Sequence, residues 1–89
     1  MTGRFAYSKA GHDKGTLYVV VRCAGDFVYL CDGRLKLMTS PKKKRLKHIQ
    51  PVNRLVENAL LNRLKSGQTV RDEEIKYAIK QYKEQSETK

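Results

Sequence analysis

Residues 17–31 read LYVVVRCAGDFVYLC, and this stretch decides the expected fold. Residues 16–24 are rich in β-branched and aromatic side chains, which favour strands. Gly25-Asp26 places glycine first, as a type II′ turn requires, and residues 27–32 form a returning strand before Gly33. The stretch therefore predicts a β-hairpin.

The turn fixes the expected register of the hairpin. Arg22 lies opposite Tyr29, and Val21 lies opposite Leu30. Because side chains alternate between the two faces of a strand, one face carries apolar residues only. We expect this face to be core, with the members Leu17, Val19, Val21, Cys23, Val28 and Leu30. The opposite face carries Tyr18, Val20, Arg22, Phe27, Tyr29 and Cys31.

The chain has two cysteines, Cys23 and Cys31, which this register places on opposite faces. Their separation of roughly 10 Å is beyond disulfide reach. We interpret both as packing residues. Two cysteines and two isolated histidines complete no zinc spacing, so we expect no metal and a reducing, cytoplasmic location.

Further strands are expected around the hairpin. Residues 5–9, 35–39 and 45–50 have strand composition, and Ser40-Pro41 ends the second of these strands. Gly11 and Gly15 bracket a loop that contains His12, Asp13 and Lys14. Residues 1–51 therefore form a β module.

The second half of the chain is expected to be helical. Residues 52–64 place apolar side chains along one helical stripe, with Asn53 as the N-cap and Gly67 as the C-terminal cap. Thr69 opens a second helix and forms a capping box with Asp72. The apolar stripe of this helix contains Ile75, Ala78, Ile79 and Tyr82.

The helical extension is assigned to residues 52–89, packed on the β module, and residues 85–89 are expected to fray. The predicted fold is thus mainly β with an α tail.

Charge restricts the class of partner. The chain carries 19 Lys and Arg against 9 Asp and Glu, a net charge of +10 over 89 residues. Residues 1–48 hold eleven of the cations and three Asp, net +8. Such an excess favours a polyanion, either a nucleic acid or an anionic membrane. The longest apolar run, residues 17–21, is too short to span a membrane, and residues 1–4 have no signal-peptide character.

No catalytic pattern is present in the sequence. It has no Ser-His-Asp set, no phosphate-binding glycine loop and no metal-ligand cluster, so we expect no enzyme, cofactor or small-molecule substrate. The acidic run at residues 72–74 is explained by the first turn of a helix. His12 is either a phosphate contact or a solvated side chain, and His48 is interpreted as structural.

A basic run follows Pro41, with five cations in the six positions 42–47. It is interpreted as a phosphate-binding segment, against two alternatives: a solubilising run and a short nuclear import signal. The aromatic face beside Arg22, made of Tyr18, Phe27 and Tyr29, is either a stacking platform for bases or the surface on which the helices dock. We favour helix docking, because an unburied helix of this size is marginal.

The order of these residues resembles a known family. Residues 3–7 (GRFAY), followed by Gly11, Gly15, Leu17 and residues 19–21, are similar to the KOW motif, a β-turn-β unit with glycines in its loop. The continuation through Val28, Leu30, Asp32-Gly33 and the basic segment after Pro41 resembles the KOW-domain large-subunit ribosomal proteins of archaea and eukaryotes. It resembles the small bacterial KOW domain-containing RNA-binding proteins still more closely. The resemblance covers residues 3 to about 50.

The resemblance implies a small SH3-like (KOW) barrel over residues 1–51, followed by two C-terminal helices. It also implies binding of structured RNA, usually ribosomal RNA, through the loop at residues 10–15 and the basic strands. Asp13 departs from a purely basic loop and is a candidate for capping its turn. The candidate RNA contacts are Lys9, Gly11, His12, Lys14, Gly15, Arg34, Lys36, Lys42, Lys43, Lys44, Arg45 and Lys47.

Two functions follow as hypotheses. The first is a non-enzymatic, ribosome-associated RNA-binding protein of the cytoplasm that grips the phosphate backbone, with ribosomal proteins as further partners. The alternative is a protein-interaction adaptor of the transcription or translation machinery, because KOW domains also bind proteins. The apolar stripe of residues 55–64 supports the alternative if one small barrel cannot cover it.

Overall fold

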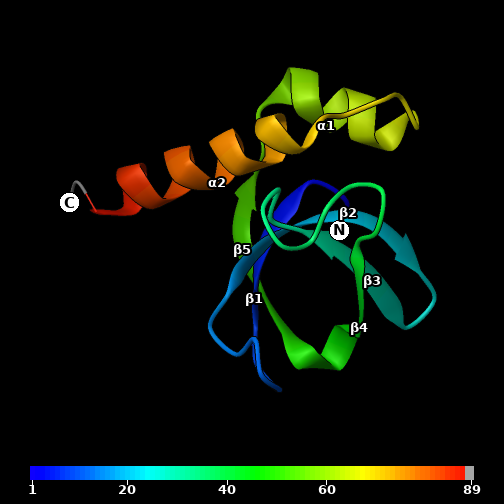
Figure 1. Cartoon of the computed structure of the whole chain (residues 1–89), viewed down its shortest axis with the longest axis vertical. Helices are drawn as coiled ribbons and strands as arrows, with labels where there is room; N and C mark the ends of the chain where they lie inside the picture. The colour runs from blue at the N-terminus through cyan, green and yellow to red at the C-terminus, as the bar shows by residue number, and fades with distance from the viewer. Residues whose placement is uncertain (88–89) are drawn as a thin grey trace.

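The computed structural model describes residues 1–87 and contains one five-stranded antiparallel sheet with two C-terminal helices (Figure 1). The sheet order is β4-β3-β2-β1-β5. The elements are β1 (Arg4–Ser8), β2 (Leu17–Ala24), β3 (Phe27–Cys31), β4 (Lys42–Arg45), the 3-10 turn η1 (Leu46–His48), β5 (Ile49–Leu55), α1 (Asn58–Lys65) and α2 (Asp72–Glu87). Both helices lie on one side of the sheet, and α2 projects beyond it (Figure 1). Within residues 1–87, no helix is both long and apolar enough to cross a membrane.

The central hairpin and its turn are confirmed. β2 pairs with β3, and Ala24, Cys23 and Arg22 lie opposite Phe27, Val28 and Tyr29. Gly25 has a φ of +60°, and no non-glycine residue among residues 1–87 has a positive φ. A turn whose only left-handed residue is the first of its two central positions is type II′.

The predicted register fails beyond Arg22. A β-bulge at Val21 shifts the pairing, so that Leu30 lies opposite Val20 and not opposite Val21. A bulge adds one residue to one strand and bends it. Alternation could not reveal the bulge, because residues 17–21 are all buried and both faces of β2 are apolar.

The core consists of two clusters, which β2 separates because its side chains alternate between them. The helix-side cluster consists of Phe5, Leu17, Val19, Val21, Cys31, Val56, Leu60, Leu61, Leu64, Val70, Ile75 and Ile79. The inner cluster consists of Ala6, Tyr18, Val20, Val28, Leu30 and Ile49. Every member of the inner cluster comes from a strand, so the sheet curves round these side chains. The predicted all-apolar core face was therefore wrong for Val28 and Leu30, which lie on the other face.

The cysteines also lie on different sides of the hairpin, and both thiols are free. Cys31 is fully buried, and burial together with the charges of Asp72 and Asp32 raises the pKa of its thiol to about 12. Its interpretation as a packing residue is confirmed. Cys23 is exposed near the tip of the hairpin, so the same interpretation was wrong for Cys23.

Residues 32–41 form a loop and not the strand expected at residues 35–39. The Oδ1 atom of Asp32 accepts hydrogen bonds from the backbone N–H groups of Arg34, Leu35 and Lys36 at 2.9–3.0 Å. These bonds tighten the chain into a turn and take up donors that a strand would have paired. The expected strand at residues 45–50 is likewise interrupted, because η1 separates β4 from β5.

The first helix begins later than its apolar stripe predicts. Residues 52–55 continue β5, in which Leu55 pairs with Arg4 and the N–H of Val56 bonds the carbonyl of Gly3 at 2.9 Å. Edge pairing with β1 satisfies these backbone groups and outcompetes the helical periodicity. α1 therefore starts at Asn58 with Glu57, and not Asn53, at its N-cap. The predicted cap at Gly67 is confirmed, since Gly67 has a φ of +73° directly after the helix.

The start of α2 differs from the predicted capping box. The acid that reaches back is Glu74, which accepts the Arg71 N–H at 3.0 Å and also pairs with the Arg63 guanidinium of α1. The hydrogen bonds from Arg63 and from the Arg71 backbone lower the pKa of Glu74 to about 2. The predicted apolar stripe of α2 is confirmed by buried Ile75 and Ile79. Fraying was expected at residues 85–89, but α2 continues through residue 87, and residues 88–89 lie outside the described residues.

Gly33 allows the loop after β3 to pack directly on the first turn of α2. Its φ is +77°, and a Cβ atom built there would lie 2.8 Å from the backbone nitrogen of Lys76 and closer still to the carbonyl oxygen of Asp72. The Asp72 carboxylate accepts the backbone N–H of Met38 from the same loop at 2.8 Å. Sheet and helix are thus joined here by backbone contact.

We expect Gly33→Ala to lower the free energy of unfolding by about 3 kcal/mol, since it combines a left-handed alanine with a backbone clash. The matched control is Gly67→Ala, where φ is +73° but no atom lies within 4 Å of the added Cβ. The control should lose only about 1 kcal/mol. Urea unfolding followed by circular dichroism measures both losses, and equal losses would show that the close approach has no energetic consequence.

Candidate nucleic-acid interface

The basic strand β4 divides its four cations between two faces. Lys42 and Lys44 pair with Leu30 and Val28, which belong to the inner cluster. Lys43 and Arg45 pair with Tyr29 and Phe27 on the opposite face. Because β-strand side chains alternate, consecutive lysines have different environments.

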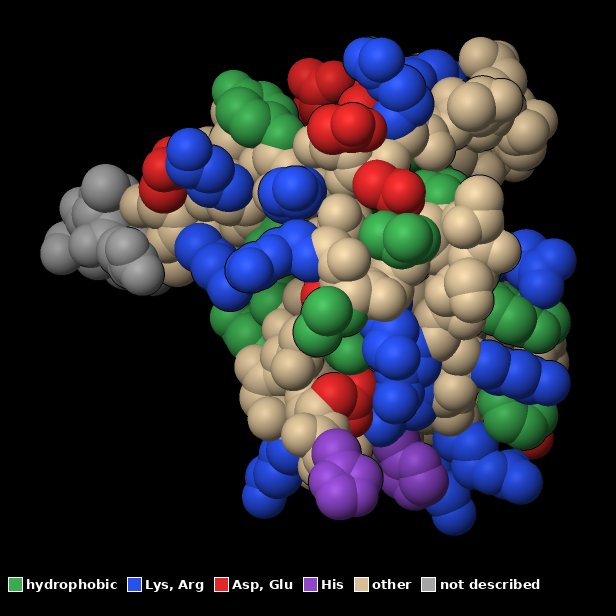
Figure 2. Space-filling view, viewed as in Figure 1, with side chains coloured by type: hydrophobic (Ala, Val, Ile, Leu, Met, Phe, Trp, Pro, Cys, Tyr) green, Lys and Arg blue, Asp and Glu red, His purple; other side chains and the backbone are tan. Residues whose placement is uncertain are grey.

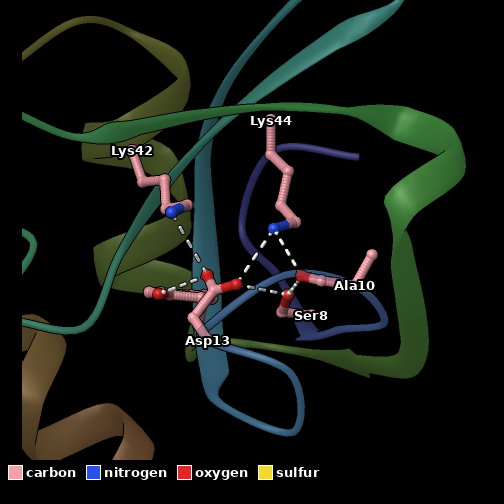
Figure 3. Close-up of polar contacts among 6 residues, drawn as sticks. Ser8, Ala10, Asp13, Lys42 and Lys44 are labelled. Carbon is pink, nitrogen blue, oxygen red and sulfur yellow. Dashed lines mark hydrogen bonds and ion pairs between the residues drawn. The ribbon is translucent and has the colours of Figure 1, made fainter.

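Lys42 and Lys44 converge on a single carboxylate, that of Asp13 (Figure 3). The Lys44 ammonium donates to Asp13 Oδ1 at 3.0 Å and to the carbonyl of Ala10 at 2.9 Å, and its side chain is only 10% exposed. Lys42 Nζ lies 3.6 Å from Asp13 Oδ2. The hydroxyls of Ser8 and Tyr18 donate to the same carboxylate, each at 2.9 Å. We call Ser8, Asp13, Tyr18, Lys42 and Lys44 the Asp13 network.

The Asp13 carboxyl group stays ionised although it is largely buried. Burial alone would raise the pKa of this carboxyl, but the hydrogen bonds from Lys44, Ser8 and Tyr18 and the charge of Lys42 together lower it well below the ordinary value. Burial and the Asp13 carboxylate raise the pKa of the Tyr18 phenol, so Tyr18 remains a hydrogen-bond donor. The network is therefore a charged, hydrogen-bonded connection between the β1–β2 loop and the edge strand β4.

On the opposite face, cations lie over aromatic rings. Lys43 Nζ is 4.3 Å and the Arg45 guanidinium carbon 5.2 Å from the centre of the Phe27 ring. The Arg22 guanidinium carbon is 4.1 Å from the centre of the Tyr29 ring. We call Arg22, Phe27, Tyr29, Lys43 and Arg45 the cation–aromatic strip. Contact with a ring restrains a long basic side chain, so these charges are held in place at the surface.

The β1–β2 loop adds exposed basic residues at one end of the sheet. Lys9, His12 and Lys14 are exposed, whereas Asp13 turns inward to its network. The backbone N–H of Lys9 bonds the carbonyl of His48 at 2.8 Å, which places η1 beside the loop. Histidine side chains lie among Lys and Arg side chains at the end of the molecule farthest from the helices (Figure 2). Gly11 and Gly15 have φ values of +86° and +90°, in the left-handed region.

The structure separates the sequence-predicted site residues into groups. The exposed ones near the loop and β4 are Lys9, Gly11, His12, Lys14, Gly15, Lys43, Arg45 and Lys47. Lys42 and Lys44 both form ion pairs with Asp13, whose single carboxylate offsets one of their two positive charges. Arg34 and half-buried Lys36 lie in the β3–β4 loop, which packs against the start of α2.

The helices dock on only part of the predicted aromatic face, since Tyr29 packs against the helix-side cluster whereas Tyr18 belongs to the inner cluster. They cover the part of the sheet that carries Leu17, Val19 and Cys31, with Phe5 stacked on Tyr82 at 4.7 Å. Tyr18 points into the inner cluster, and Phe27 stays half exposed beneath its cations. The bulge at Val21 places Cys31 of β3 opposite Val19, so Cys31 joins the apolar side of β2 that the helices cover.

No protein-family model matches the chain, and a search of curated proteins finds no significantly similar sequence.

Lys44→Met should destabilise the fold, because it leaves a largely buried carboxylate without its closest cation, at a cost of about 2–3 kcal/mol. Lys43→Met, on the next residue of the same strand, should change stability by less than about 0.5 kcal/mol. Thermal unfolding of the two variants compares the positions directly. Equal losses would contradict the division of β4 into inner and outer cations.

Acid should weaken the fold through Asp13, because its folded-state pKa is lower than its unfolded-state value. The stabilisation is complete above about pH 5 and is lost as pH falls below the unfolded-state pKa of about 3.9. Asp13→Asn should lower stability at neutral pH and flatten this acid dependence. Asp26→Asn, at the exposed hairpin turn, is the control and should retain the wild-type slope in urea unfolding at a series of pH values.

Proposed function

We propose that the protein is a non-enzymatic RNA-binding protein that grips the phosphate backbone of structured RNA. The observation that carries the proposal is the alternation on β4. Lys42 and Lys44 neutralise Asp13 internally, while Lys43 and Arg45 are exposed over Phe27 beside the loop that carries Lys9 and Lys14. Exposed cations without a protein counter-charge are best neutralised by a polyanion, whose binding releases counterions.

The sheet topology supports an SH3-like barrel of the KOW type. The edge strands β4 and β5 are consecutive in the chain and are joined through η1. η1 is attached on both sides, since Leu46 N–H bonds the Asp26 carbonyl and Lys9 N–H bonds the His48 carbonyl. Such a connection draws the two edges of a curved sheet toward each other. The glycine-bracketed loop at residues 10–15 fits the KOW motif that the sequence resembles.

Recognition is proposed to be of RNA shape and backbone, with little reading of bases. The rings of Phe27 and Tyr29 are already faced by cations, so they serve to position charge in place of stacking on bases. The resemblance to KOW-domain ribosomal proteins makes ribosomal RNA in the cytoplasm the proposed target, with ribosomal proteins as neighbours.

The alternative function, a protein-interaction adaptor, rests on one groove. A cavity of about 450 Å³ lies between the end of β5 and α2, and Leu55 and Tyr77 at its rim are 48% and 61% exposed. Most of the stripe at residues 55–64 is nevertheless covered, since Leu60, Leu61 and Leu64 are buried. Nuclease treatment separates the functions: an RNA binder loses its high-mass association in cell extract, whereas an adaptor keeps it.

RNA affinity should fall steeply with salt, with a log–log slope of about −3 to −5 for about four to six neutralised phosphates. Lys43→Gln/Arg45→Gln should make this slope shallower by about 1.5, because two contacts are lost. Fluorescence anisotropy with a labelled RNA hairpin measures both slopes. The control Lys65→Gln/Arg71→Gln removes the same charge from two exposed positions, one at the end of α1 and one just before α2. An equal effect of both doubles, or a slope near zero for the wild type, would contradict the proposal.

A further inference from the structure

A second basic surface lies where α2 passes over the loops of the sheet. A groove of about 510 Å³ runs between α2 and the ends of the β1–β2 and β3–β4 loops. Its cationic lining residues are Arg34 from the β3–β4 loop and Lys76, Lys80 and Lys83 from α2. Lys and Arg side chains gather along α2 and between this helix and the sheet (Figure 2).

The three lysines follow helical spacing and therefore form a stripe. Positions 76, 80 and 83 lie four and three residues apart, which places them on one face of α2. The stripe extends about 10 Å along the helix axis, at 1.5 Å per residue. A set of charges this long fits an extended polyanion better than a single small anion.

Two carboxylates of α2, those of Asp72 and Glu74, are engaged away from the groove. Asp72 accepts the Met38 N–H, and Glu74 pairs with Arg63. Two acids line the groove itself: Asp32, whose Oδ1 accepts three backbone N–H groups, and Glu84. Among side chains of residues 1–86, no ion pair within 4 Å involves any of the four lining cations. The groove lining thus carries four cations against two acids, a net positive charge.

The β3–β4 loop and α2, which line the groove, are in direct contact. Gly33 brings the β3–β4 loop against the first turn of α2, and the Asp72–Met38 hydrogen bond fixes it there. Gly15 and Thr16 line the opposite side, directly after exposed Lys14 of the β1–β2 loop. The groove therefore adjoins the β1–β2 loop, which forms part of the proposed RNA interface.

We propose that this groove binds the phosphodiester backbone of the same RNA, so that α2 forms a second contact region in addition to β4 and the loop. This inference rests on the proposed function. Lys76, Lys80, Lys83 and Arg34 are the contacts, and they act as point charges and one guanidinium fork on successive phosphates. The C-terminal helices are then part of the binding surface as well as the cover of the core.

The test compares Lys76→Gln/Lys80→Gln with the control Lys65→Gln/Arg71→Gln, using the full chain and the labelled RNA hairpin. Glutamine has a helix propensity similar to that of lysine, so α2 should stay intact, and circular dichroism checks this. We expect the groove double to make the salt slope shallower by about 1.5 and to weaken binding roughly tenfold near physiological salt. The control should leave both quantities close to the wild-type values.

The outcomes separate the groove from the rest of the interface. If Lys43→Gln/Arg45→Gln weakens binding while the groove double behaves like the control, the groove inference is overturned and the proposed function stands. If the wild type binds no RNA, both the groove inference and the proposed function are contradicted. Polyglutamate is the competitor that tests the ligand class: if it displaces the RNA hairpin as well as unlabelled RNA of equal charge does, the groove is a site for acidic protein and the inference is wrong.

Discussion

The Asp13 carboxylate is the constraint on which the arrangement of this small domain depends. It lies in the β1–β2 loop and receives hydrogen bonds from the end of β1, from β2 and from β4. A largely buried carboxylate must be paired, and here two lysines and two hydroxyls satisfy it. The loop and the edge strand therefore cannot move independently. One acidic residue in a basic loop thus determines which lysines are structural and which remain free for a partner.

Strands β1 to β3, the hairpin turn and the α2 stripe could be predicted because each rests on local sequence. Gly25-Asp26 favours a type II′ turn through its own residues, and β-branched residues favour β2. The bulge at Val21 could not be predicted, because residues 17–21 are buried on both faces and alternation carries no information there. β5 replaced the first turns of the expected helix because pairing with β1, a long-range interaction, outweighs local periodicity.

The candidate site was predicted only as a region. Composition located the cations of β4, but their division into inner and outer sets depends on the pairing with β3. The sequence signal for that division was Asp13 itself, an acid among cations whose partner could not be identified without the fold. The α2 lysines were hidden for a different reason. The acids of the same helix outnumber them, but the structure uses Asp72 and Glu74 elsewhere.

Lysine side-chain NMR during titration with an RNA hairpin tests the central claim most directly, because it reports each ammonium group separately. The account predicts that the Lys43 signal moves as RNA is added. It also predicts that the Lys44 signal stays in place, since its ammonium remains bonded to Asp13 and to the carbonyl of Ala10. Movement of the Lys44 signal equal to that of Lys43, or no movement of either, would contradict the division of β4 into structural and binding cations.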